Sequence, residues 1–299
     1  MKVATFGAGA FGKAMHLVAQ AGGDAVLLGR RQAPGVSTDW RSALPDADIV
    51  AMAVPAQATR EALRLISGEI RHDAILLLLA KGIETNTGML QTEIAAAEAP
   101  GHEAMVLTGP SFASEMQAGL PTAVTLAASN EGLGERVQAR LAGPAFRPYL
   151  TSDVIGAQIG GALKNVIAIA CGAAMGRGLG ESARAALMTR GFAEMTRVAA
   201  ARGARLETLA GLSGFGDLSL TCASTKSRNF AFGFALGEGR LAPGATYEGV
   251  ATAEAAVSLT TRLGVEAPVT KTVAALVSGA QDVDGAMADL LSRPLRREV

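Results

Sequence analysis

Short apolar runs recur through the first half of the chain, and segments with helical spacing separate them. The runs are Lys2–Phe6, Ala25–Leu28, Ile49–Val54, Ala74–Leu79, Ala104–Leu107 and Ala123–Ala127. The helical patterns between them include Lys13–Ala21, Ala58–Ile66 and Thr87–Ala97. Nearly continuous apolar runs are typical of strands that are buried on both faces of a sheet. Their alternation with helices predicts a doubly wound, mostly parallel α/β sheet.

The second half of the chain has a different pattern. After the short segment Phe146–Leu150 the strand signal fades, and alanine-rich stretches fill most of 154–203 and 251–264. Because alanine is the best helix former, we expect a mostly α-helical domain there. A length of 299 residues accommodates two domains, which we place at 1–150 and 151–299.

Composition, charge and cysteine usage limit the class of protein. With 49% hydrophobic and 18% charged residues, the chain has the composition of a well-packed soluble protein. Its 27 basic and 27 acidic residues balance, so no global field favours nucleic acid or an acidic membrane, and any phosphate site must be local. Cys171 and Cys222 lack the spacing of metal ligands, which predicts buried thiols, no metal site and a reducing compartment.

Two further features concern location. The apolar stretch in Met1–Phe6 is too short for a signal peptide. The longest strongly apolar run, Ala74–Ala80, falls far short of the roughly 20 residues that a membrane-spanning helix needs. We therefore predict a cytoplasmic protein without a membrane span.

A glycine-rich turn, Gly7-Ala8-Gly9-Ala10-Phe11-Gly12, joins the first expected strand to the first expected helix. This is the place of the phosphate-binding turn in a Rossmann-type dinucleotide-binding domain. Gly7 permits the tight turn, Gly9 lets the backbone approach a pyrophosphate, and Gly12 lets helix and strand pack closely. The helix start supplies free N–H donors, so we expect Ala10 and Phe11 at the cofactor as well. A purely structural glycine turn is the alternative.

The second expected strand ends in Arg30 and Arg31. In NAD-selective proteins an acidic residue near this point accepts hydrogen bonds from the adenosine ribose. A carboxylate would repel the extra phosphate of NADP, whereas guanidinium groups pair with it. The two arginines therefore predict NADPH as the preferred cofactor and NADH as the second choice. Two solvated arginines beside an NADH site are the alternative interpretation.

Further segments resemble the NAD(P)-dependent glycerol-3-phosphate dehydrogenase family, in an order and spacing that covers nearly the whole chain. They are Ala80-Lys81-Gly82, Thr108–Ala113, Gly160–Val166, Thr189-Arg190-Gly191, Gly214–Leu218, Leu220-Thr221-Cys222, Ser227-Arg228-Asn229 and Arg293-Pro294-Leu295. The resemblance implies a homodimer that reversibly reduces dihydroxyacetone phosphate, a small phosphorylated substrate, to sn-glycerol 3-phosphate. It also implies that this product supplies glycerophospholipid synthesis.

Such a reaction needs a group that gives a proton to the developing alkoxide. The histidines are poor candidates, because His16 lies in an expected helix and His72 and His102 occupy polar, loop-like stretches. Lys164 lies in Gly161–Ala170, a segment almost devoid of other charge, where an ammonium is costly unless it is paired or its pKa falls. The resemblance gives Lys164 the general acid–base role. A lysine that extends to solvent from an amphipathic helix is the alternative.

Asp217 and Thr221 are candidates for the same pocket. They are four residues apart, so within a helix they share one face, and the Asp217 carboxylate is a candidate partner for Lys164. We expect both to contribute to catalysis or substrate binding. Alternatives are a helix cap by Asp217 and a Thr221 hydroxyl that bonds to a backbone carbonyl.

Lys81 follows an expected strand, and ligands collect at the carboxyl ends of parallel strands. We therefore expect Lys81 to face the cleft, although a lysine in a polar loop is the alternative. The resemblance implies that Lys81 contacts substrate and cofactor, that Gly109 and Ser111 line the same substrate wall, and that Ala113 approaches the nicotinamide.

Ser227-Arg228-Asn229 places a hydroxyl, a forked cation and an amide side by side. Such a set suits a phosphate group through charge-assisted hydrogen bonds. The resemblance implies that the triplet binds the substrate phosphate and that Arg228 also contacts the cofactor. Glu248 matches a further cofactor position of the family, but an isolated glutamate is equally compatible with surface charge.

Two positions depart from the family pattern, and two other functions stay open. Gln158 replaces a common glutamate, and Ser182 lies where an asparagine-containing stretch is usual, which affects the substrate pocket or its support. One alternative is a reductase of the same two-domain layout that acts on a small hydroxy acid, for which a phosphate clamp has little use. The other is a dinucleotide-binding regulator, which needs no buried proton donor.

Overall fold

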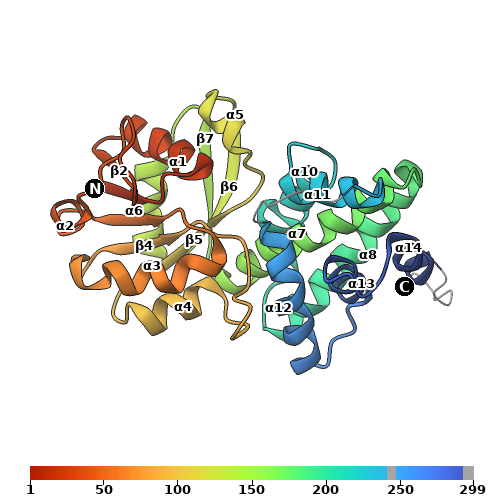
Figure 1. Cartoon of the computed structure of the whole chain (residues 1–299). Helices are drawn as coiled ribbons and strands as arrows, with labels where there is room; N and C mark the ends of the chain where they lie inside the picture. The colour runs from red at the N-terminus through yellow and green to blue at the C-terminus, as the bar shows by residue number, and fades with distance from the viewer. Residues whose placement is uncertain (241–246, 292–299) are drawn as a thin grey trace.

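The computed structural model describes residues 1–240 and 247–291, which form a sheet-containing domain and a helical domain side by side (Figure 1). The helical domain extends away from one edge of the sheet, and its last described helix lies at the end farthest from it. The fold class is the predicted one, a Rossmann-type α/β domain followed by a mostly α-helical domain.

The first domain is built on a seven-stranded sheet with the order β2-β1-β3-β4-β5-β6-β7. The strands are β1 (Val3–Phe6), β2 (Ala25–Leu28), β3 (Ile49–Met52), β4 (Ile75–Leu78), β5 (Ala104–Thr108), β6 (Thr122–Ala127) and β7 (Phe146–Thr151). Neighbouring strands run parallel except β5 and β6, which are antiparallel, so the expected mostly parallel sheet is confirmed. The carboxyl ends of β1 to β5 meet at one edge, where open α/β sheets bind ligands.

Helices cover both faces of this sheet. They are α1 (Ala10–Ala21), α2 (Trp40–Ala43), α3 (Thr59–Ile66), α4 (Gln91–Glu98), α5 (Ala113–Gln117) and α6 (Glu131–Leu141). Leu63 of α3 and Ile94 of α4 belong to the core on one face, and Met15 of α1 and Val137 of α6 belong to the core on the other. Apolar side chains are thus buried on both faces, which explains the continuous apolar strand runs.

Helix α4 begins at Gln91, later than the Thr87 that the pattern predicts. The Leu90 N–H donates to Glu93 Oε2 at 2.7 Å, which fixes the first turn of the helix. Upstream, Gly88 has a φ of 70°, a left-handed conformation that ends regular helix geometry and favours glycine. The start of the expected helix is therefore a loop.

The second domain packs its helices around one long central helix. The helices are α7 (Val154–Gly176), α8 (Gly180–Ala201), α9 (Leu206–Ala210), α10 (Asp217–Thr221), α11 (Arg228–Gly237), α12 (Glu248–Arg262), α13 (Pro268–Val277) and α14 (Val283–Leu291). Within the described residues, α7 alone is long and apolar enough to cross a membrane. Of its apolar 18-residue stretch, 89% is buried inside the protein. Protein contacts therefore account for its apolar surface.

Glycine lets α7 and α11 approach at backbone distance. A Cβ atom on Gly172 would lie 2.1 Å from Phe230 O, and one on Gly233 would lie 2.1 Å from Ile169 O. Both distances are too short for any side chain. The small residues of α7 thus serve close helix packing, which fixes the start of α11 beside the helix that carries Lys164.

The two domains join without a linker. Strand β7 ends at Thr151 and α7 begins at Val154, with Asp153 between them as helix cap. Asp153 Oδ1 accepts from Gly156 N at 2.8 Å, and Oδ2 accepts from Arg205 N at 2.8 Å. The first turn of α7 is therefore anchored at the edge of the sheet opposite the carboxyl ends of β1 to β5, and Gly161, two turns later, lies beside Thr108 at the carboxyl end of β5.

Candidate active site

A cleft of about 510 Å³ lies between the carboxyl ends of the parallel strands and the helical domain. One wall comes from the glycine turn, the segments after β4 and β5, and α5. The other wall comes from α7, α10, α12 and the start of α11. The expected site residues in its lining are Gly9, Ala10, Phe11, Lys81, Ser111, Ala113, Lys164, Thr221, Ser227, Arg228, Asn229 and Glu248.

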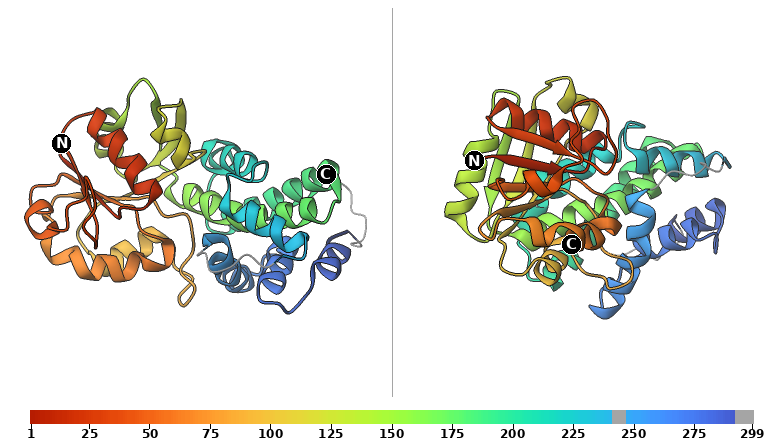
Figure 2. Two further views of the ribbon diagram at one scale, coloured as in Figure 1. Left: turned by 45° about the horizontal axis from the view of Figure 1, so that its top comes forward. Right: turned by 60° about the vertical axis from the view of Figure 1, so that its left-hand side comes forward.

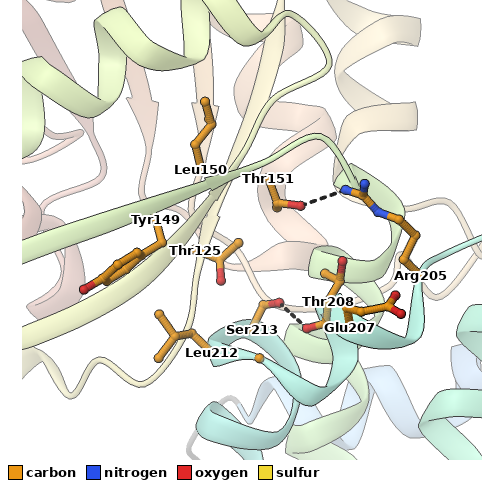
Figure 3. A pocket seen from close by; sticks show the side chains of 10 residues that line it. Thr125, Tyr149, Leu150, Thr151, Arg205, Glu207, Thr208, Leu212 and Ser213 are labelled. Carbon is orange, nitrogen blue, oxygen red and sulfur yellow. Dashed lines mark hydrogen bonds between the residues drawn. The ribbon is translucent and has the colours of Figure 1, made fainter.

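A second hollow, of about 550 Å³, lies between the β6–β7 edge and the segment around α9 (Figure 3). Arg205 donates to Thr151 Oγ1 at 3.1 Å on one side of it, and Ser213 donates to Thr208 O at 3.3 Å on the other. Its described lining contains none of the expected catalytic groups. We therefore assign the active site to the cleft.

The glycine turn has the geometry that a dinucleotide requires. Gly7 has a φ of 117°, and a Cβ there would lie 2.5 Å from Ala53 O. A Cβ on Gly12 would lie 1.8 Å from Gly7 O, so helix and turn touch at backbone distance. Gly9, by contrast, faces open space in the cleft, at the start of α1 where backbone N–H groups lack helical partners. The turn therefore fits the pyrophosphate of a nicotinamide dinucleotide.

A carboxylate buried beneath the cleft joins two lysines from different domains. Lys164 Nζ lies 2.5 Å from Asp217 Oδ1, and Lys81 Nζ lies 2.9 Å from Asp217 Oδ2. The side chains of Lys164 and Asp217 are 8% and 1% exposed, so neither extends to solvent. The alternative of a solvent-seeking Lys164 is therefore wrong, and the expected pairing with Asp217 is present.

The two ammonium groups differ in how many of their three N–H donors are used. Lys81 donates to Gly109 O at 2.8 Å, to Ser111 Oγ at 3.3 Å and to Asp217, so its donors are saturated. Among the described residues, Lys164 has two acceptors, Asp217 and Thr221 Oγ1 at 2.9 Å. One N–H of Lys164 is left to meet a ligand in the cleft.

Burial and charge set the protonation of this cluster. Burial is the largest cause that lowers the pKa of Lys164, to about 8. The Asp217 carboxylate opposes this effect and raises the pKa, whereas the Lys81 ammonium lowers it further. Burial alone would raise the pKa of Asp217, but Lys164 and Lys81 together hold that pKa below its ordinary value. The carboxylate is therefore ionised, while Lys164 is poised to exchange a proton near neutral pH.

Asp217 directly follows a π-helical turn, Leu212–Gly216, which places its carboxylate between the two lysines. Asp217 is the first residue of α10, and the residue that caps the helix is Gly216, with no side-chain cap bond. The alternative of Asp217 as a helix cap is therefore wrong, because its oxygens bind the lysines. Thr221, one turn later, donates to Asp217 Oδ1 at 3.3 Å. As expected, the two residues share one face of the helix.

The expected phosphate triplet begins α11, but its members face different partners. Ser227 Oγ accepts from Phe230 N at 3.3 Å and caps the helix. Asn229 Oδ1 accepts from Gly249 N at 3.0 Å, which ties α11 to α12. Arg228 is exposed. Glu248, at the start of α12, has a pKa raised by burial, while Lys81 and Arg228 partly oppose that rise.

Comparison with known proteins identifies the family that carries this arrangement. The N-terminal model of NAD-dependent glycerol-3-phosphate dehydrogenase matches residues 32–133, and the C-terminal model matches residues 153–288. A glycerol-3-phosphate dehydrogenase [NAD(P)+] of Parvibaculum lavamentivorans is 46% identical over 99% of this chain and 98% of its own length. The chain belongs to the NAD-dependent glycerol-3-phosphate dehydrogenase family.

Two more relatives agree with this assignment. The protein of the same name from Brucella ovis is 45% identical, with 99% of both chains covered. The crystal structure of glycerol-3-phosphate dehydrogenase from Coxiella burnetii matches with a TM-score of 0.92 and 34% identity, over 98% of this chain and 99% of that one. Sequence and fold thus agree over both domains of the family.

Some expected site residues of this family member lie outside the lining of the cleft. Gly7, Gly12 and Gly109 act through the backbone, and the Gly109 carbonyl holds Lys81. Arg30 and Arg31 are exposed beyond the end of β2. Both arginines are therefore accessible to solvent.

Among the cleft residues that were not singled out from the sequence, one has an amide side chain and one has a charged side chain. Asn165 lines the cleft, and its Nδ2 donates to Lys81 O at 3.1 Å, so it joins the segments that carry both lysines. Its position directly after Lys164 was the available signal. Lys226 also lines the cleft, directly before the triplet, but its charge alone did not separate it from surface lysines.

The two departures from the family pattern lie away from the cleft lining. Gln158 Oε1 accepts from Thr92 N at 3.0 Å, and its Nε2 donates to Thr92 Oγ1 at 2.9 Å. Because an ionised glutamate accepts only, the amide makes a reciprocal pair that glutamate would not. Ser182 is exposed on α8. The expected family tail, Arg293-Pro294-Leu295, lies outside the described residues.

Proposed function

We propose that this protein catalyses the reversible, NAD(P)H-dependent reduction of dihydroxyacetone phosphate to sn-glycerol 3-phosphate, which supplies glycerophospholipid synthesis. One observation carries the proposal: a buried, partly unsatisfied Lys164 ammonium lies in the same cleft as the dinucleotide turn and the Ser227-Arg228-Asn229 triplet. The names of the relatives point to the same reaction.

The chemistry follows from the lysine cluster. The nicotinamide, when bound, supplies the hydride to the carbonyl carbon. Lys164 Nζ gives its proton to the ketone oxygen as negative charge develops there, and in the oxidation direction it takes the proton back. Asp217 orients Lys164 and keeps it cationic, and Thr221 accepts a second hydrogen bond from the same ammonium. Lys81 adds a fixed positive charge beside the developing alkoxide.

The remaining roles follow the cleft walls. Gly9, Ala10, Phe11, Ala113 and Glu248 hold the dinucleotide, with Gly7 and Gly12 fixing the turn. Ser111 and the backbone of Gly109 line the substrate wall together with Lys81. Arg228 pairs with the substrate phosphate and the cofactor, and Ser227 and Asn229 present the first turn of α11 to that phosphate.

Four further proposals depend on less local signals. Arg30 and Arg31 favour NADPH over NADH, because their exposed guanidinium groups suit a 2′-phosphate. The dinucleotide-binding domain is 1–150 and the substrate domain 151–299. The two buried thiols support a reducing, cytoplasmic location. The functional unit is a homodimer.

The test is turnover by purified protein with NADPH and three carbonyl substrates. We expect cofactor consumption with dihydroxyacetone phosphate, and a kcat/KM at least about 100-fold lower for dihydroxyacetone, which lacks the phosphate. Faster turnover of a small 2-oxo acid would favour the related hydroxy-acid reductase. Cofactor binding without turnover of any of these substrates would favour the regulator.

A further inference from the structure

One ion pair crosses the mouth of the cleft between the two domains. Lys226 Nζ, directly before the phosphate triplet, lies 2.8 Å from Glu115 Oε1 of α5. In both views of Figure 2, the yellow segment that contains α5 lies on the side of the first domain nearer the helical domain. The lysine lines the cleft, but neither partner belongs to the lysine–carboxylate cluster.

The backbones of both partners are held in place, while the lysine side chain is accessible. Gln117 Nε2 of α5 donates to Ala10 O at 2.8 Å, which ties α5 to the glycine turn. Lys226 N donates to Ser224 Oγ at 3.1 Å, which fixes the turn before α11. The Lys226 side chain is 60% exposed and that of Glu115 is 33% exposed. An ion pair this exposed adds little to stability, so little opposes its separation.

The charges that line the cleft indicate that a phosphate group is a stronger partner for the Lys226 ammonium than Glu115 is. The charged side chains in its described lining are Lys81, Lys164, Lys226, Arg228 and Glu248. Lys81 and Lys164 are engaged by Asp217, so Lys226 and Arg228 are the solvent-exposed cations of this lining. A phosphate dianion offers more charge and more acceptor oxygens than one carboxylate.

We propose that Lys226 is a further phosphate-binding residue, which Glu115 holds at the cleft mouth until a phosphate group displaces the carboxylate. The proposal rests on the function proposed above for its substrate. The phosphate belongs either to the substrate or to the cofactor, and both have the same chemistry for an ammonium. Glu115 therefore competes with the ligand, and the two partners have opposite effects on binding.

If Lys226 binds phosphate, loss of its charge and loss of the Glu115 charge change the KM in opposite directions. If the ion pair only holds the two domains together as a latch, loss of either charge weakens binding. We expect Lys226→Ala to raise the KM for dihydroxyacetone phosphate about threefold to tenfold, with kcat within about twofold of wild type. Glu115→Gln keeps the shape of the side chain, removes its charge, and lowers the same KM. Lys226→Arg retains the cation and restores a KM close to that of wild type. The double variant, Glu115→Gln with Lys226→Ala, behaves like Lys226→Ala alone.

The dissociation constants of NADPH and NADH, measured by fluorescence on the same variants, identify the source of the phosphate. A change confined to the KM for dihydroxyacetone phosphate assigns Lys226 to the substrate, and a change confined to the dinucleotides assigns it to the cofactor. Weaker binding in both Lys226→Ala and Glu115→Gln would indicate a latch between the domains and would overturn the proposal. Unchanged constants in all variants would overturn it as well. If the wild-type protein turns over no phosphorylated ketone, the proposed function fails, and the dinucleotide measurements still test Lys226.

Discussion

The two walls of the cleft are built in opposite ways. On the dinucleotide wall, glycines set the geometry: Gly7 and Gly12 leave no room for a side chain, and Gly9 leaves the backbone open to the ligand. On the helical wall, charged side chains set the geometry, with Lys164 and Asp217 buried against each other. In the function proposed above, one wall binds the dinucleotide through shape and backbone dipoles, whereas the other acts through the ionisation of its side chains. The comparison predicts that variants of the first wall alter affinity or folding, and variants of the second alter turnover and its pH dependence.

Loss of Lys164 is the largest expected effect. Lys164→Ala removes the proton donor, so we expect kcat for the reduction to fall by about 10²- to 10⁴-fold. Binding of NADPH should be retained, because the glycine turn is intact. Steady-state rates and fluorescence titration of the cofactor measure the two quantities.

A matched control is Lys271→Ala, the same substitution at an exposed lysine of α13 in the same domain. It should leave both quantities as in wild type. Turnover of Lys164→Ala within a few-fold of the control would refute the assigned role.

Removal of the Asp217 charge is the next effect in size. Asp217 raises the pKa of Lys164, so Asp217→Asn should lower that pKa further. Because reduction needs protonated Lys164, its rate should then decline from a lower pH than in wild type, with about a tenfold loss for each pH unit beyond the pKa. The pH dependence of kcat measures this shift. Thr221→Val removes a hydroxyl but no charge, so its shift should be smaller; an equal shift would contradict the electrostatic explanation.

The difference between the two walls also explains which features could be predicted from the sequence. The strands and the glycine turn were accessible because their signals are local, and α4 was misplaced only at its start. Lys164 was recognisable as a charge within an apolar helix. The Lys81–Asp217 contact joins residues that are far apart in the chain, across two domains. The family resemblance assigned both residues to the substrate site, but their contact was not predicted. The saturation of the Lys81 donors and the reach of Lys226 to Glu115 depend on side-chain geometry that no sequence pattern specifies.

Two glycines of the dinucleotide wall should affect different properties, one the stability of the fold and the other the affinity for the cofactor. A Cβ on Gly12 would meet the backbone oxygen of Gly7, so Gly12→Ala should destabilise the protein by about 1–3 kcal/mol or more. Gly9→Ala adds a methyl group in open space, so it should leave Tm close to that of wild type while the Kd for NADPH rises about tenfold. Thermal denaturation and cofactor titration test both. Equal losses of stability in the two variants would contradict the different roles of these glycines.

The last expected effect is confined to the choice of cofactor, because Arg30 and Arg31 are both exposed beyond the end of β2. Replacement of both by alanine should raise the KM for NADPH about tenfold and leave the KM for NADH nearly unchanged. The ratio of kcat/KM for the two cofactors measures the preference. A ratio that does not change would assign the arginines to the solvated surface.

The central claim is that Lys164, with a pKa lowered by burial to about 8, donates the proton during reduction. The most direct test is the pH dependence of kcat for dihydroxyacetone phosphate reduction in the wild-type protein, between about pH 6 and 10. We predict a plateau at low pH and a decline above about pH 8, with the reverse dependence for oxidation of sn-glycerol 3-phosphate. A reduction rate that stays constant or rises through this range would contradict the account.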